Sequence, residues 1–411
     1  MNRWIRLVGA VVAMMMIANL QYAWTLFVKP IVGANHWKLS DVQWGFSIFV
    51  ALETWMMPFS GWLIEWLGPR AFMTVAGIMC GVGWAGMGQA KTLPEMYILY
   101  ALAGFGAALV YCGSLGTVKW FPDKRGLAAG LISAGFGSGS ALFVPIVAYL
   151  IRARDYHTAF LYTGIAQGLI IMIAAQFLRN PAPGAVAAAP AKIQIRTHGE
   201  DFHSFEMLRT PQFYVLFLMA LMMGIGGLMA TAQVAPMADT LKIGAAALTL
   251  SLTLNPLANG AARISWGWVS DHLGRERTMF IAFLLQSVVL LGVVKLGHIS
   301  ATWFIVTMAL VFFTWGEVYS LFPSICADWF GAKNVSSNYG FIYAAKGVAS
   351  IVGGGAAAAL FEKTGSWNYG FYACSALALI TAIMALGLRK MPLPHKKPVK
   401  AHVAAVGDYA R

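Results

Sequence analysis

The chain has 411 residues, of which 59% are apolar and only 11% are charged, and its mean hydropathy is +0.67. This composition excludes an ordinary soluble globular domain and is typical of a protein that crosses a membrane many times. The formal net charge is +13, which membrane orientation accounts for without a nucleic-acid partner.

Twelve stretches are long and apolar enough to span a bilayer, which predicts an all-α membrane protein. The first stretch follows only Arg3 and Arg6, is too long for the core of a signal peptide and lacks a convincing cleavage site, so we expect it to be retained. The twelve predicted spans are 7–28, 43–67, 71–90, 95–118, 126–151, 158–178, 212–238, 244–270, 278–297, 301–323, 334–361 and 367–388.

The placement of lysine and arginine predicts the orientation of these spans. With a cytoplasmic N-terminus, the inside segments hold 19 of the 29 basic residues and the outside segments hold eight, while two lie within spans. Cytoplasmic loops carry such an excess of positive charge. We therefore expect both termini in the cytoplasm.

The chain contains an internal repeat. Residues 61–70 (GWLIEWLGPR) return as 267–277 (GWVSDHLGRER), 206 positions later, and Trp120-Phe121 returns as Trp329-Phe330 at an offset of 209. Repeats at half the chain length predict two pseudo-symmetric six-helix halves with a binding site between them near the middle of the membrane. We expect the halves at 1–179 and 211–390, a cytoplasmic linker at 180–210 and a basic cytoplasmic tail at 391–411.

The repeated motif is expected to control access to that site. A glycine at its start permits close helix approach, and its acid can pair with a basic group or with the N-terminus of a neighbouring helix. Such a charge latch would hold one access state shut. The gating candidates are Gly61, Glu65, Gly68, Arg70, Gly267, Asp271, Gly274 and Arg275.

Two cations lie inside spans. Arg263 falls in the apolar run 245–268 and Lys346 in the run 339–360, and neither run contains a second charged residue. A cation at the middle of a bilayer costs roughly 3 kcal/mol on insertion scales. An intramembrane ionisable residue indicates function by default, and two cations predict an anion site.

Aromatic residues are expected to form the walls of that site. Trp315 and Tyr319 are separated by four positions, and Tyr343 and Lys346 by three, so each pair shares a helix face. The other candidates are Tyr22, Trp24 and Tyr111.

Glu53 and Glu317 are the carboxylates well inside predicted spans. Each is either a helix-packing carboxyl or a proton-coupling or counter-charge group. Two cations roughly 8 Å apart repel by about 2 kcal/mol at an effective dielectric near 20, so a site of cations alone predicts obligatory exchange. A nearby carboxylate would let proton symport compete with exchange.

Other classes of protein are poorly supported. The four cysteines fall singly in different spans, and the sequence has no Cys/His cluster, catalytic triad or phosphate-binding loop, so we expect no metal, no cofactor and no enzyme. A membrane sensor for a carboxylate is the alternative outside transport, although linker and tail are too short for a folded output domain.

Five segments resemble the bacterial oxalate:formate antiporter group of the major facilitator superfamily. They are residues 21–26 (QYAWTL), 120–128 (WFPDKRGLA), 207–213 (MLRTPQF), 313–316 (FTWG) and 339–346 (YGFIYAAK), and the resemblance covers nearly the whole chain. It implies the major facilitator fold, a monomer in the bacterial inner membrane, and alternating access. It also implies a site in which Arg263 and Lys346 bind a carboxylate within a cage that includes Tyr22, Tyr111, Trp315 and Tyr319.

The sequence departs from that group at four positions of the site. A cage tyrosine is Phe136 here, a cage tryptophan is Tyr343, a glutamine is Glu53 and a glycine is Glu317. Oxalate, formate, another monocarboxylate and a larger organic acid all stay open as substrates. We expect anion exchange, with proton-coupled monocarboxylate symport as the alternative.

Overall fold

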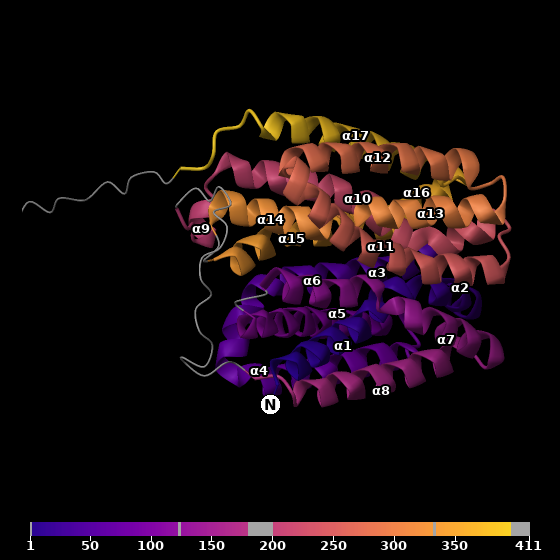
Figure 1. The fold of residues 1–411 in the computed structure, drawn as a ribbon. Coiled ribbons are helices and arrows are strands. Elements are labelled where there is room, and N and C mark those ends of the chain that lie inside the picture. The colour runs from indigo at the N-terminus through magenta and orange to yellow at the C-terminus, as the bar shows by residue number, and fades with distance from the viewer. Residues whose placement is uncertain (1, 122–124, 180–199, 332–333, 396–411) are drawn as a thin grey trace, which may run out of the picture.

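The computed structural model describes residues 2–121, 125–179, 200–331 and 334–395, and every regular element in these ranges is helical (Figure 1). The first group of helices is α1 (Arg3–Tyr22), α2 (Trp24–Asn35), α3 (Leu39–Trp55), α4 (Met57–Met87), α5 (Leu93–Leu115), α6 (Arg125–Ser138), α7 (Ser140–Ala153) and α8 (Tyr156–Ala175). The second group is α9 (Ser204–Met207), α10 (Pro211–Thr240), α11 (Ala245–Leu273), α12 (Arg275–Leu296), α13 (Ala301–Trp315), α14 (Val318–Phe330), α15 (Val335–Ile351), α16 (Ala357–Thr364) and α17 (Asn368–Leu388).

Helices cover each of the twelve predicted spans. Ten helical segments of the described chain meet the length and apolarity expected of a membrane span. The other two predicted spans are also helical, one as α3 with the start of α4 and the other as α11. The protein is therefore an all-α, multi-pass membrane protein.

Several spans are interrupted where the sequence predicts continuous helices. The first span breaks at Ala23 between α1 and α2, and the tenth breaks at Gly316 and Glu317 between α13 and α14. In the eleventh span a π-helical turn, Val352–Ala356, separates α15 from α16. Irregular backbone at membrane depth is tolerated where it is enclosed by protein or lines a cavity. The residues at these breaks are buried, apart from Val352 and Ala356 at the two ends of the π-helical turn.

The helices form two stacked groups, α1–α8 and α10–α17 (Figure 1). Across the interface α3 packs on α15 and the π-helical turn, α6 and α7 pack on α11, and α2 packs on α10. The repeat makes the second span equivalent to the eighth and the fifth equivalent to the eleventh. The two main contacts, α3 with α15 and α11 with α6 and α7, are therefore related by the repeat.

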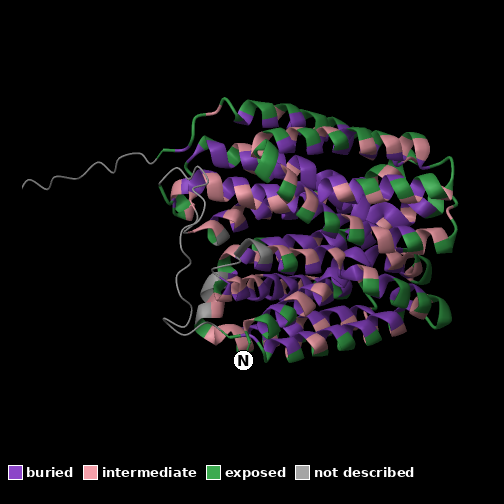
Figure 2. Cartoon of the chain, in the orientation of Figure 1, coloured by how far each residue is buried: buried purple, intermediate pink, exposed green. Residues whose placement is uncertain are grey.

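Burial follows the two groups (Figure 2). Buried residues face the interior of each group and the interface, while the outer surface carries exposed apolar side chains such as Ile173, Val288 and Ile383. An apolar surface of this extent is stable against lipid and not against water. The N-terminus, α9 and the end of α17 lie at one end of the bundle, on the left in Figure 1.

Candidate functional site

Eight of the nine predicted binding residues come together at the interface between the two helix groups. Each of these side chains is at most 7% exposed. They are Tyr22 of α1, Tyr111 of α5, Phe136 of α6, Arg263 of α11, Trp315 of α13, Tyr319 of α14, and Tyr343 and Lys346 of α15. The ninth, Trp24, instead packs against Tyr100 and donates to Oε1 of Gln43 at 3.0 Å.

Lys346 is held by three acceptors. Its Nζ donates to Oε1 of Gln21 at 2.8 Å, to Oε2 of Glu53 at 2.9 Å and to the hydroxyl of Tyr343 at 3.2 Å. Lys346 and Glu53 form a buried salt bridge between α15 of one group and α3 of the other. Glu53 is thus the counter-charge of this cation, one of the roles that its position within a predicted span left open.

Arg263 is held by neutral groups. Its Nε and one terminal nitrogen donate to Oδ1 of Asn259 at 3.2 and 3.1 Å, and its other terminal nitrogen donates to the carbonyl and hydroxyl oxygens of Ser133 at 2.9 and 2.7 Å. Ser133 belongs to α6, so Arg263 also bridges the two helix groups. Gly137 lies beside it, because a Cβ there would come within 3.0 Å of the guanidinium Nε.

The two cations share aromatic neighbours. The Arg263 guanidinium carbon and Lys346 Nζ lie 5.7 and 5.3 Å from the centre of the Phe136 ring, and 4.3 and 5.9 Å from that of Tyr319. The cations are therefore no further apart than the sum of the last two distances. Aromatic faces attract cations at such distances, by about 2 kcal/mol when both are desolvated.

The aromatic residues form a continuous cage around the cations. Trp315 packs edge-on against Tyr319 across the helix break, with 5.4 Å between ring centres. Gly227 of α10 makes room for this indole, because a Cβ there would lie 2.0 Å from the Trp315 ring. The other ring pairs are Tyr22–Phe136, Phe136–Tyr111, Tyr111–Tyr343 and Tyr343–Tyr319, with centres 5.7 to 6.0 Å apart.

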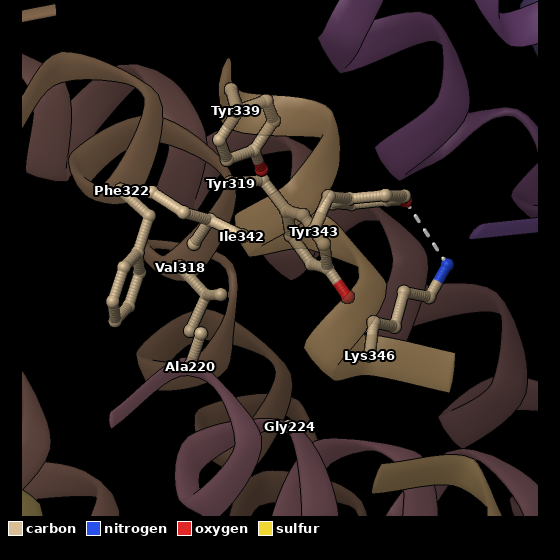
Figure 3. A pocket seen from close by; sticks show the side chains of 9 residues that line it. All are labelled: Ala220, Gly224, Val318, Tyr319, Phe322, Tyr339, Ile342, Tyr343 and Lys346. Atoms are coloured by element: carbon tan, nitrogen blue, oxygen red, sulfur yellow. Dashed lines mark hydrogen bonds between the residues drawn. The ribbon is translucent and has the colours of Figure 1, made fainter. Parts of the chain in front are cut away.

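A small cavity borders the cage on the side of α10 (Figure 3). Its volume is about 10 Å³, close to the minimum for one water molecule. Figure 3 shows Tyr343 and Lys346 of α15 joined by their hydrogen bond, with Tyr319 of α14 beside Tyr343 and Phe322 of the same helix at the opposite side of the view. The side chains therefore enclose Lys346 tightly on this side.

The second intramembrane acid differs from the first. Glu317 lies at the break between α13 and α14 with no exposed surface, and neither carboxyl oxygen has a hydrogen-bond partner among the described residues. It forms no salt bridge there, whereas Glu53 does. The two acids therefore have different surroundings.

The second copy of the repeated motif forms ion pairs. Arg275 contacts Asp271 at 2.7 Å and Asp328 of α14 at 3.2 Å. Gly274 has φ of 87° and Gly68, its equivalent, has φ of 72°, so both turns use a conformation that favours glycine. Gly267 does not have the expected role in close packing, because a Cβ there would find its nearest neighbour, Ser320, at 3.9 Å.

The first copy of the motif is described only in part. Gly61 and Glu65 lie in α4. The structure describes neither the side chain of Glu65 nor the surroundings of Gly61. Arg70 lies two residues after the kink of α4 at Gly68, and its Nε is buried without a hydrogen-bond partner among the described residues.

Polar contacts join the two helix groups at the end opposite to the termini. Gln43 of α3 donates to the Ala232 carbonyl at 2.8 Å and to Gln233 Oε1 at 3.0 Å. Ser47 and Ser350 exchange hydrogen bonds through each other's carbonyls at 2.7 and 3.0 Å. Further out, Lys29 pairs with Asp239, and Ser40 donates twice to Glu362.

Sequence reasoning missed three partners of the cations. Gln21 adjoins Tyr22 in residues 21–26, and Asn259 lies one helical turn before Arg263. The sequence position of each residue therefore indicated that it could lie near a predicted site residue. Ser133 carried none, because its contact with Arg263 depends on how α6 packs against α11.

A bundle of membrane-spanning helices in two repeated groups, with two cations buried in aromatic rings between them, defines the general class: a multi-pass membrane protein with a polar centre. The sequence matches the model of the Major Facilitator Superfamily over residues 7–326 and again over 215–407. The chain belongs to this superfamily, and the expected fold is confirmed.

Named relatives extend this result. The chain is 38% identical to the Oxalate:formate antiporter of Oxalobacter formigenes, over 98% of this chain and 94% of that protein. It is 24% identical to Monocarboxylate transporter 11 of Mus musculus, over 87% and 82%, and 25% identical to Apicoplast pyruvate carrier 1 of Toxoplasma gondii, over 89% and 77%. The resemblance found in the sequence is confirmed, and the protein is a transporter and not an enzyme.

Proposed function

We propose that the protein exchanges small carboxylates across a membrane by alternating access, with Arg263 and Lys346 as the groups that bind the anion. The observation that carries the proposal is the position of both cations, which are buried, set against the same two aromatic rings and located between the helix groups. The relatives support the substrate class, since their names give oxalate, formate, monocarboxylates and pyruvate.

Alternating access assigns the motion to the two halves, 1–179 and 211–390. Both cations connect the halves, Arg263 through Ser133 and Lys346 through Glu53 and Gln21. A substrate carboxylate that takes over these contacts therefore changes the energy of the interface itself. In this proposal the two motif copies, residues 61–70 and 267–277, lie at the cytoplasmic end of the bundle and hold that end closed in one access state.

The cellular setting follows from the charge distribution and the bacterial relative. The protein is a monomer of the bacterial inner membrane with both termini and residues 180–210 in the cytoplasm, and it needs no nucleic acid. The positions of the N-terminus and of the end of α17 at one end of the bundle agree with this topology (Figure 1).

The direct test is counterflow in proteoliposomes loaded with one carboxylate and supplied with labelled formate, oxalate or pyruvate outside. We expect exchange by the unaltered protein and its loss in Arg263→Gln and Lys346→Gln, each of which removes a charge and keeps a hydrogen-bonding side chain. Undiminished exchange by both variants would refute the anion site.

Proton-coupled symport of a monocarboxylate is the second candidate. The observation that favours it is Glu317, a carboxyl group buried without a hydrogen-bond partner among the described residues. The two functions differ in one measurement, because symport gives net uptake driven by a pH gradient into liposomes that contain no carboxylate.

A further inference from the structure

The donor groups of the two cations are used differently. A lysine ammonium has three donors, and all three of Lys346 are engaged, by Gln21, Glu53 and Tyr343. A guanidinium has five donors, and the hydrogen bonds of Arg263 to Asn259 and Ser133 use four of them. These four hydrogen bonds leave one donor of Arg263 for a carboxylate, whereas a carboxylate reaches Lys346 only by displacing a partner.

The two cations also differ in whether an acid neutralises their charge. Lys346 is neutralised by Glu53 at 2.9 Å, with side chains 5% and 1% exposed, while Arg263 forms no salt bridge with a described acid. Oε1 of Glu53 accepts no hydrogen bond from a described residue, so the lysine holds this carboxylate through one oxygen. The three charged groups together carry one net positive charge, and this charge is on the arginine side.

We propose that Glu53 is a built-in carboxylate ligand of Lys346 and makes the site selective for substrates with a single carboxylate. This inference rests on the proposed transport of carboxylates. A monocarboxylate that binds Arg263 and takes the place of Gln21 or Tyr343 on Lys346 balances the net charge of the site. A dicarboxylate such as oxalate brings a second negative group towards Lys346, where Glu53 already lies, and like charges placed together in a buried site repel strongly.

The test compares Glu53→Gln and Glu53→Asp with the unaltered protein in the exchange of labelled formate and labelled oxalate. Glutamine keeps the length and the acceptor oxygen of Glu53 and removes its charge, whereas aspartate keeps the charge. We expect the unaltered protein and Glu53→Asp to prefer formate, and the ratio of oxalate to formate exchange to rise by about tenfold or more in Glu53→Gln.

A binding measurement covers the case in which Glu53→Gln folds but does not turn over. Ligands that bind the folded state raise its melting temperature, so the purified variants are heated with formate or with oxalate. Oxalate should stabilise Glu53→Gln more than it stabilises the unaltered protein, and formate should not.

The failures are distinguishable. Equal exchange of formate and oxalate by the unaltered protein, or an unchanged ratio in Glu53→Gln, overturns the role of Glu53 and leaves carboxylate exchange in place. Exchange of no carboxylate by the unaltered protein overturns the proposed function itself.

Discussion

Phe136 has both cations near its ring, and this single side chain contributes to the surroundings of each charge. The sequence marked it only as a departure, a cage residue without a hydroxyl. A phenyl ring can attract a cation but offers no hydrogen bond to an anion. In the proposed site, the hydroxyls of Tyr22, Tyr111, Tyr319 and Tyr343 are therefore the aromatic groups that could hydrogen-bond a substrate, and Phe136 contacts the cations instead.

Glu317 permits a prediction at the scale of one residue. Burying an unpaired charge is costly, and a proton on the carboxyl removes that cost, so this group is where a coupled proton would be carried. If the protein takes up a monocarboxylate together with a proton, we expect Glu317→Gln to abolish pH-gradient-driven uptake and to retain exchange measured without a gradient. Uptake into proteoliposomes at equal and unequal pH checks this, and unchanged gradient-driven uptake by the variant would contradict it.

The cation site was largely predictable from the sequence, and its charge pairing was not. Arg263 and Lys346 stand out because each is alone in an apolar run, and a bilayer penalises such residues. That Glu53 would reach Lys346, 293 positions away, depends on the packing of α3 against α15. Spacing along one helix reports only on neighbours within that helix, so the two roles considered for Glu53 could not be separated.

Among the elements, the helices were predictable and their breaks were not. The length of an apolar run predicts a membrane span. It does not predict the break between α13 and α14, because the two residues there, Gly316 and Glu317, include no proline and no turn motif. The break is compatible with the tertiary surroundings of the site, where Trp315 fills the space left by Gly227 and Tyr319 packs against it from the next helix. Local propensity carries no information about such contacts.

The motif glycines give a prediction at this scale. Gly274 has φ of 87° and ψ of 155°, a region adopted almost only by glycine, so Gly274→Ala should lower the free energy of unfolding by about 1–3 kcal/mol. Gly267→Ala is the matched control, since Gly267 lies in the same motif within α11 and a Cβ there would meet only Ser320, at 3.9 Å. Thermal unfolding in detergent should show a lower midpoint for Gly274→Ala alone. Equal midpoints for the two variants would mean that the turn conformation is unimportant.

At the scale of the whole molecule, alternating access requires the end that carries Lys29 and Asp239 to open. These two side chains belong to different halves, form an ion pair and are 70% and 56% exposed, so a reagent can reach both positions. We expect a cleavable bifunctional thiol reagent to reduce exchange by Lys29→Cys/Asp239→Cys to less than about a tenth, because gating motions limit turnover in many proteins.

The controls for that experiment are the two single cysteine variants, treated in the same way, and cleavage of the reagent, which should restore exchange. Cys112 is half-buried and the other three native cysteines are buried, so the single variants also report any background reaction. Full exchange by the cross-linked protein would show that this end does not need to open.

The polar seam between the halves is formed mainly by uncharged groups, the amides of Gln43 and Gln233 and the hydroxyls of Ser47 and Ser350. Dissolved salt weakens attraction between exposed charges, yet it has little effect on hydrogen bonds between neutral groups. The buried hydrogen bonds at this end are thereby insulated from ionic strength, whereas the exposed pair of Lys29 and Asp239 is not. The hydrogen bonds between neutral groups at this end would therefore keep their strength when the surroundings of the cell change from dilute to saline.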